Sequence, residues 1–346
     1  MAYTTINKPT AYINTKLYTG TGSSQGITGV GFQPDFVWVK DRSSAGENSL
    51  FDAVRGVNKR IRSNSSGAET TAANSLTAFD SDGFTVVSHG DVNTNSTTYA
   101  SWNWKAGTTS GITTNGSTDT TPSSYSFNQT SGISILKYAG SGSTPTKIAH
   151  GLGVAPKLII VKNLSGTADW VVGHHDMEWT KYIYLSSTAA SVTAGGAAWE
   201  NTAPDTVNFT VGDNTQINAS GSDYIAYCFS EVDGFSSFGK YTGNGNEDGK
   251  FCYTGFKPAI VLCKRTNGTS SWGIFDNKRD PLNTVNKTLF PNSNTSEDSS
   301  TVRMDFLSNG FKHRTTDTAW NGSNDEYIWI AFASEPIVGT NPATGY

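Results

Sequence analysis

The sequence has few cysteines, few charges and no long apolar run. Its three cysteines, Cys228, Cys252 and Cys263, form no Cys-x-x-Cys pair, and their odd number argues against a framework of disulfides. We expect all three to be reduced residues of the core. No apolar stretch approaches the roughly 18 residues of a transmembrane helix, so the sequence predicts no membrane insertion.

Charged residues make up 16 % of the chain, against about 25 % in typical soluble domains. The formal net charge is -4 and no basic stripe occurs, so nucleic acid is not an expected partner. The N-terminal residues lack the basic start and apolar core of a secretory signal. A polar, weakly charged composition without an export signal fits a virion protein that assembles in the host cytoplasm and leaves by lysis. It also fits an ordinary cytoplasmic protein.

What the chain does contain favours strands and turns. It has 36 glycines, abundant serine, threonine and asparagine, and 12 % aromatic residues. These residue types suit strands or turns better than helix interiors. The sequence therefore predicts an all-β protein.

Several landmarks recur three times in the same order. A Tyr-x-Gly-x-Gly signature begins at Tyr18, Tyr138 and Tyr241. Each signature is followed by a Gly-x-x-Pro segment that leads into a short apolar run ending in lysine. These runs are 36–39, 158–161 and 260–263, and they end at Lys40, Lys162 and Lys264. Continuous apolar runs between a proline and a lysine indicate buried central strands.

The repeat continues beyond the central strands. At the same distance after each proline stand Asp52, His174 and Asp276, and every copy closes with an aromatic strand. The sequence thus predicts three tandem antiparallel β-sandwich units of jelly-roll type. The expected parts are an N-terminal anchor segment (1–10), a first unit (11–106), a Thr/Ser/Gly linker (107–130), a second unit (131–230), a third unit (231–335) and a C-terminal tail (336–346). The linker predicts that the first unit sits apart, while the other two abut.

One stretch allows two interpretations. Leu50, Val54, Val57 and Ile61 fall at helical spacing, which would make 48–63 a helix. The matching part of the third copy contains a proline and that of the second copy alternates like a strand. We therefore expect strand–turn–strand here.

No motif indicates catalysis. The sequence lacks a Gly-x-Ser-x-Gly elbow, a P-loop and a His-Glu-x-x-His motif. No pattern isolates a pair of carboxylates at the separation that a glycosidase needs. We expect a non-enzymatic protein without catalytic residues or cofactors.

Two sets of residues are candidates for binding. His174, Asp176 and Glu178 would share one face of a strand and offer metal ligands; the alternative is a polar strand or turn at the surface. Trp199 and Trp320 lie among small polar residues, where an exposed indole ring would stack on a sugar; the alternative is burial under a loop.

Four segments of the first copy resemble a known repeat. They are Gly-Phe-x-Pro-Asp-Phe-Val-Trp-x-Lys (31–40), Leu-Phe-Asp-x-x-Arg-Gly (50–56), Phe-Asp-Ser-Asp-Gly-Phe (79–84) and Tyr-x-x-Trp-x-Trp-Lys-Ala-Gly (99–107). The pattern resembles a repeat common in predicted structural and tail-fibre-like proteins of marine tailed phages. His-Gly-Leu-Gly-x-x-Pro at 150–156 is similar to a segment frequent in phage tail proteins. The resemblance implies a virion setting and carries no catalytic residues.

Three functions follow as hypotheses. The first is a short tail-associated fibre or adhesin on the virion exterior that contacts a host surface polysaccharide. The second is a capsid decoration or head-fibre protein bound to the shell. The third, of another class, is a glycan-cleaving enzyme or its carbohydrate-binding module. The expected partners are other virion proteins and further copies of the chain, with a trimer as the default for fibres.

Overall fold

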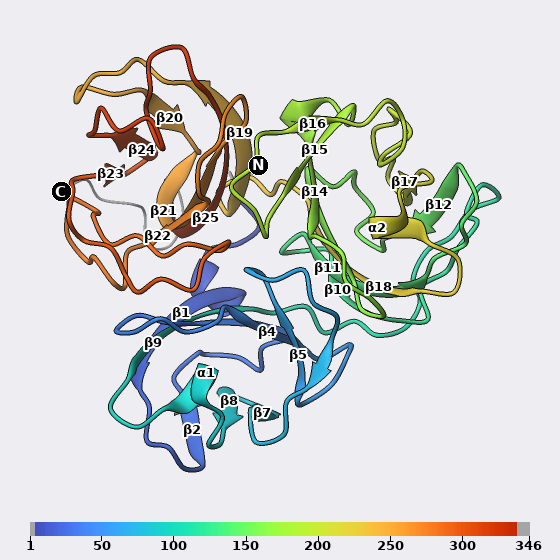
Figure 1. Cartoon of the computed structure of the whole chain (residues 1–346), viewed down its shortest axis with the longest axis horizontal. Coiled ribbons are helices and arrows are strands. Elements are labelled where there is room, and N and C mark those ends of the chain that lie inside the picture. The colour runs from blue at the N-terminus through green and yellow to red at the C-terminus, as the bar shows by residue number, and fades with distance from the viewer. Residues whose placement is uncertain (1–3, 338–346) are drawn as a thin grey trace.

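The computed structural model describes residues 4–337, and this part of the chain is nearly all β (Figure 1). Its first third contains η1 (Pro9–Ala11), β1 (Ile13–Thr19), β2 (Gln25–Thr28), β3 (Phe36–Asp41), β4 (Ser49–Asp52), β5 (Lys59–Arg62), β6 (Thr70–Thr71), β7 (Leu76–Asp80), β8 (Gly83–Val86), α1 (Gly90–Asn93) and β9 (Thr98–Trp104). We call this the first segment. β4 and β5 confirm the strand–turn–strand interpretation of 48–63.

The second segment contains β10 (Ser124–Asn128), β11 (Ile133–Ala139), β12 (Thr146–Ala149), β13 (Leu158–Asn163), β14 (Val171–His174), η2 (His175–Met177), β15 (Lys181–Tyr184), β16 (Val192–Thr193), β17 (Asn208–Val211), α2 (Thr215–Asn218) and β18 (Asp223–Phe229). The third segment contains β19 (Ser236–Thr242), β20 (Phe251–Tyr253), β21 (Phe256–Arg265), β22 (Gly273–Asp276), β23 (Met304–Leu307), β24 (Gly310–His313) and β25 (Glu326–Pro336). No helix within residues 4–337 is long and apolar enough to cross a membrane.

Each segment contributes one larger antiparallel sheet, and the three sheets have related strand orders. The orders are β1-β9-β3-β4-β5-β6, β10-β11-β18-β13-β14-β15-β16 and β19-β25-β21-β22. In all three, the strand that carries the apolar run lies between the closing strand of its segment and the next strand along the chain. Every residue of β3 and β13 is buried, which confirms the central strands predicted from the apolar runs.

One face of each larger sheet is covered by a smaller one. The smaller sheets are β2-β8-β7, β12-β17 and β20-β24-β23. Each pair of sheets encloses a local apolar core, in which two tyrosines stack: Tyr18 on Tyr99, Tyr138 on Tyr224 and Tyr241 on Tyr327. In each pair one tyrosine begins the Tyr-x-Gly-x-Gly signature and the other lies opposite it in the closing strand, so the stacked rings tie these two paired strands together.

The opposite faces of the three larger sheets meet in one shared core. Figure 1 shows the three segments arranged around a common centre, with the first below, the second at the right and the third at the left. At this centre Trp104, Phe229 and Phe332, which occupy equivalent places in the closing strands, contact one another with ring centroids 5.7–6.4 Å apart. The first segment therefore does not sit apart from the other two, contrary to expectation.

The stretch expected as a linker is largely part of the fold. β10 lies within it and pairs with β11, and Ile112 packs against the core of the second segment. Hydrogen bonding along the edge of β11 and a few apolar side chains hold this stretch against the sheet, although its composition is typical of a linker. The prediction of an extended spacer was wrong for Ser124–Asn128.

The expected anchor and tail lie partly outside the described residues. Residues 1–3 of the anchor and 338–346 of the tail are not described. The described part of the anchor joins the fold, because Ile6 is buried in the shared core and η1 lies beside β25. These residues thus contact the chain's own third segment.

Candidate functional site

The three segments form a closed ring in which each contacts the next: the first contacts the second, the second contacts the third, and the third contacts the first. We call these contacts the first, second and third junctions. The first is made by Asp52, whose Oδ2 accepts a hydrogen bond of 2.6 Å from the Tyr227 hydroxyl. The third is made in the same way by Asp276, whose Oδ2 accepts from Trp102 Nε1 at 3.1 Å. In both, the aspartate is the last residue of a strand, β4 or β22, and its carboxylate bonds to a side chain in the closing strand of the next segment.

The second junction uses a different pair at the same place. Ile330 occupies the position of Tyr227 and Trp102 in the pairing of the sheets, and it has no polar hydrogen. His174 stands where the other junctions have aspartate, and its Nε2 lies 3.3 Å from the Trp329 carbonyl oxygen. Its Nδ1 accepts from the backbone N–H of Asp176, so Nε2 carries the proton and donates. The imidazole of His174 therefore stands in place of an aspartate carboxylate, because its partner, the Trp329 carbonyl, needs a hydrogen-bond donor.

Each aspartate also begins a buried chain of alternating charges. Arg55 Nε donates to Asp52 at 2.6 Å, and Arg55 also donates to Glu69 at 3.2 Å. In the third junction, Arg279 donates to Asp276 at 2.6 Å and to Glu297 at 3.3 Å. Both arginine side chains are fully or almost fully buried.

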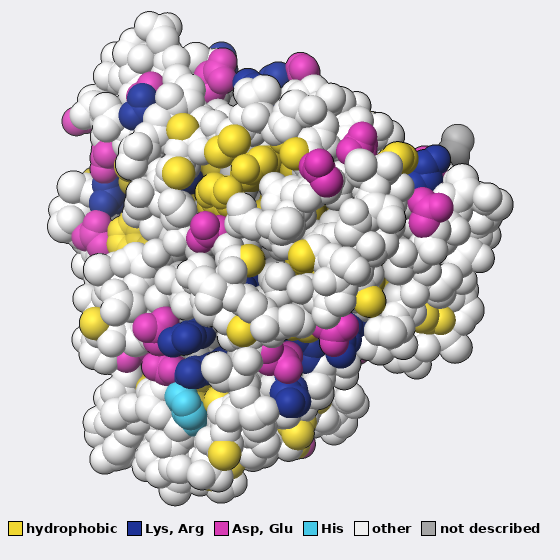
Figure 2. All heavy atoms as spheres, turned by 45° about the vertical axis from the view of Figure 1, so that its right-hand side comes forward, with side chains coloured by type: hydrophobic (Ala, Val, Ile, Leu, Met, Phe, Trp, Pro, Cys, Tyr) yellow, Lys and Arg dark blue, Asp and Glu magenta, His cyan; other side chains and the backbone are white. Residues whose placement is uncertain are grey.

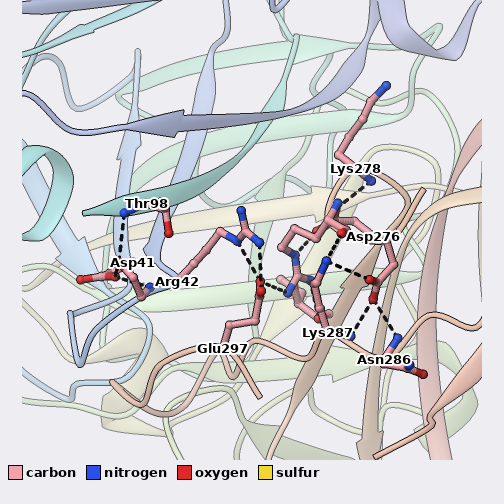
Figure 3. Close-up of polar contacts among 12 residues, drawn as sticks. Asp41, Arg42, Thr98, Asp276, Lys278, Asn286, Lys287 and Glu297 are labelled. Atoms are coloured by element: carbon pink, nitrogen blue, oxygen red, sulfur yellow. Dashed lines mark hydrogen bonds and ion pairs between the residues drawn. The ribbon is translucent and has the colours of Figure 1, made fainter. Parts of the chain in front are cut away.

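Figure 3 shows the third junction, with Glu297 between Arg42 of the first segment and the Asp276 region of the third. Arg42 donates to both carboxylate oxygens of Glu297 at 2.9 Å. Such paired geometry is the strongest form of carboxylate recognition. The acid–arginine–acid chain therefore reaches across the junction.

In the second junction the whole chain is replaced by neutral side chains. Met177 follows His174 as Arg55 follows Asp52 and as Arg279 follows Asp276. Ser191 takes the place of Glu69 and Glu297. Its backbone N–H donates to the carbonyl of Thr266, just as that of Glu69 donates to the carbonyl of Leu164 and that of Glu297 to the carbonyl of Arg42. The second segment thus lacks the arginine and both acids together.

A groove of about 410 Å³ lies at this place between the second and third segments. Met177 and Ser191 form part of its wall, beside the ends of β19 and β25. The other lining residues are Asp176, Glu178, Thr180, Lys181, Lys240, Tyr241, Thr242, Lys250, Thr266, Glu326, Tyr327 and Ile328. The size is in the range of pockets that hold small ligands.

The groove carries three lysines and three acids that are not paired with one another. Lys181, Lys240, Lys250, Glu178 and Glu326 are exposed, and none of their side chains takes part in an ion pair within the described chain. The third acid, Asp176, has its Oδ2 3.6 Å from Nε2 of His175. The groove therefore offers hydrogen-bond donors and acceptors that the fold itself does not use.

Three buried lysines join the junctions from the other side. Each is the next-to-last residue of a central strand. Each donates from Nζ to a backbone carbonyl of the neighbouring segment in the ring: Lys40 to Asn294 at 3.1 Å, Lys162 to Ser66 at 3.0 Å and Lys264 to Thr188 at 3.3 Å. Burial lowers the pKa of Lys40 and Lys162 to about 8 and that of Lys264 to about 7. The lysine that ends each apolar run is thus a link between segments.

The structure brings together only part of the predicted metal site. His174, His175 and Asp176 have possible ligand atoms within 4.8 Å of one another, whereas Glu178 is exposed beyond η2. His174 is fully buried, and both of its ring nitrogens are engaged with backbone groups. Burial lowers its pKa to about 3, which keeps the ring neutral. These contacts give His174 a structural role at the start of η2.

The two tryptophans predicted to bind glycans are buried. Trp199 and Trp320 each have 1 % of their surface exposed. Trp199 packs on Gly173 and Trp320 on Gly273, where a Cβ atom would lie within 3 Å of either indole ring. The prediction of exposed stacking rings was therefore wrong, because glycines in the neighbouring strands open space for the rings inside the fold.

Sequence reasoning missed the aromatic rings that are exposed. Phe251 and Tyr253 in β20 are 40 % and 58 % exposed, and the intervening Cys252 is buried. Alternation of this kind was a readable signal of one outward face on a strand. Figure 2 shows small groups of mixed charge on one face of the molecule, together with a patch of hydrophobic side chains in its upper part.

Comparison with known proteins identifies a family. A family model matches residues 8–336, which include all three larger sheets. No curated protein and no solved structure matches the chain significantly. The chain therefore belongs to the family described as a domain of unknown function, DUF7483.

Proposed function

We propose that this protein is a non-enzymatic structural component of a tailed-phage particle, assembled in the host cytoplasm and placed on the virion exterior. Within the particle it would be a short tail-associated fibre or adhesin that contacts the host surface. The observation that carries the proposal is the closed ring of three segments, each joined to the next around one apolar core. Such a body is suited to present surfaces rigidly.

The architecture within this proposal is three tandem copies of one antiparallel β-sandwich of jelly-roll type. The related strand orders, the stacked tyrosine pairs and the equivalent lysine contacts support a common origin of the three segments. The sequence resemblance of the first segment to repeats of phage structural proteins supports the virion setting. The same resemblance, added to the closed ring, favours a fibre because the repeat occurs in tail-fibre-like proteins.

The buried ionisable groups support a structural role. Asp52 and Asp276 hold neighbouring segments together through arginine, tyrosine or tryptophan. Acids engaged in this way would have to break junctions in order to transfer protons. The charges of the shared core are therefore explained by assembly of the fold.

Immunogold electron microscopy of purified particles tests the location. Antibodies against the third segment should label the tail; label over the head would favour the capsid decoration alternative, and particles without label would contradict both. Light scattering of the purified protein tests the predicted trimer. Release of reducing ends from a host polysaccharide by the pure protein would overturn the non-enzymatic proposal.

A further inference from the structure

We propose that the groove of the second junction binds a short segment of a polyhydroxylated glycan, and that the second segment diverged to make room for it. The inference deepens the proposed function, because a host-surface glycan is what an adhesin would contact. It rests on the difference between this junction and the other two.

The groove occupies a place that is filled elsewhere. Arg55 with Glu69 and Arg279 with Glu297 bridge the corresponding positions of the first and third junctions. In the second junction Met177 replaces the arginine and Ser191 replaces the glutamate, so two neutral and shorter side chains line the groove instead. The opening therefore results from the loss of one specific bridge.

The loss is coordinated, which distinguishes the groove from a packing defect. Removing only the arginine would leave two buried carboxylates without their partner, which is strongly destabilising. Here the aspartate, the arginine and the glutamate are all replaced. Meanwhile His174 still reaches Trp329, and Thr188 still accepts from Lys264. The junction has kept its links while giving up its buried charges.

The lining indicates the chemistry of the ligand. Three carboxylates accept hydrogen bonds, three ammonium groups donate them, and the hydroxyls of Thr180, Ser191 and Thr242 do either. Tyr241, Tyr327 and Ile328 are buried, so the groove exposes no large apolar ring to an apolar ligand or a nucleobase. Balanced charge gives no strong attraction for a polyanion. A chain of sugar hydroxyls, with an occasional acidic group opposite a lysine, uses this lining best.

Two other hollows of the described surface lack this combination. A hollow of about 440 Å³ beside the first junction is lined by Ala53, Val54 and hydroxyl side chains without ionisable groups other than Tyr125. Another, of about 540 Å³, contains Asp248, Asp305 and Arg314, which are already joined in ion pairs. Unpaired charges of both signs are thus a property that sets the groove apart from these two.

The decisive variant closes the groove by rebuilding the arginine–glutamate bridge, Met177→Arg/Ser191→Glu, and leaves His174 on the Trp329 carbonyl. We expect it to fold with a melting temperature close to that of the parent, because the two introduced charges pair with each other. Binding to an array of neutral and acidic bacterial surface oligosaccharides should weaken at least tenfold. The matched control is Thr113→Arg/Thr114→Glu, which introduces an arginine and a glutamate at exposed positions away from the groove and should bind like the parent.

A second variant covers the case in which the first does not fold. Lys240→Gln/Glu326→Gln changes two exposed side chains of the rim and should also weaken binding at least tenfold while melting like the parent. Parent protein that binds no glycan on the array, or variants that bind as well as the parent, would overturn the inference. Loss of binding on Tyr253→Ala alone would also overturn it, because it would place the site on β20.

Failure of this inference is distinct from failure of the proposed function. Immunogold label on the tail together with no glycan binding removes the glycan site and leaves the fibre. Glycan binding by a protein that is absent from particles removes the fibre and leaves the site.

Discussion

The first and third junctions are closed by buried charges, whereas the second is closed by neutral groups and has an open groove. Asp52–Arg55 and Asp276–Arg279 have the same spacing and the same contacts, although they lie at opposite ends of the chain. His174 and Met177 occupy the same two positions with different chemistry. The same contact between neighbouring segments is therefore made by buried ion pairs in two junctions and by neutral side chains in the third.

The difference shows what the buried charges require. A buried ion pair contributes little over a well-packed apolar set of similar volume, but losing one partner is costly. Intermediate combinations of the two solutions are therefore unfavourable. This explains why the second segment departs at all three positions together.

The largest effect should come from breaking one charged junction. Arg279→Met leaves Asp276 and Glu297 without their buried partner, so the free energy of unfolding should fall by about 3–5 kcal/mol. Met177→Leu, the matched change in the neutral junction, should cost less than about 1.5 kcal/mol. Urea denaturation of both variants measures the contrast. Equal losses would mean that the two kinds of junction do not differ energetically.

A smaller effect concerns the buried lysine of the second junction. The pKa of Lys264 is about 7 in the folded protein and about 10.5 when unfolded, so the unfolded chain binds more protons between these values. Stability should therefore rise with pH above 7, by at most about 1.4 kcal/mol per pH unit from this residue. Lys264→Met should reduce that rise in denaturation experiments between about pH 7 and 9. At higher pH the raised pKa of buried tyrosines such as Tyr241 reverses the trend.

The sequence contained part of this comparison. Continuous apolar runs reveal β3 and β13 because burial on both faces leaves a local pattern. Asp-x-x-Arg at 52–55 and 276–279, against His-x-x-Met at 174–177, was also readable from the aligned copies. These features lie within short stretches of sequence, so they can be recognised without knowing which other parts of the fold they contact.

The shared core and the groove were not predictable in this way. Both depend on which sheet faces meet, and nothing in β9, β18 or β25 alone states that their aromatic rings contact one another. Glu69 and Ser191 stand at the same distance after Asp52 and His174, but Glu297 lies four residues further from Asp276, so the equivalence of all three appears only from their backbone contacts. Trp199 and Trp320 were misjudged because the glycines beneath them are distant in sequence.

By pH 5 the acid response should separate the junctions by about 2 kcal/mol. The pKa of His174 is about 3 in the folded protein and about 6.5 when unfolded, so the unfolded chain gains its proton first as pH falls. Stability is lost below about pH 6.5, at about 1.4 kcal/mol per pH unit. His174→Asn should remove this part of the acid dependence, and His175→Asn, whose ring is partly exposed, is the matched control. His313 keeps a similar response in both variants.

The smallest effect should come from the charges that line the groove. Lys240 and Glu326 are exposed and have no ionic partner among the described residues, so Lys240→Gln and Glu326→Gln should each change the free energy of unfolding by less than about 0.5 kcal/mol. Thermal melting of both, beside Arg279→Met, tests whether charge at the second junction is dispensable for the fold. A loss of 2 kcal/mol or more in either would show that these side chains support the junction. A negligible change would show that the fold does not need these charges, so any loss of glycan binding in the same variants could not be attributed to unfolding.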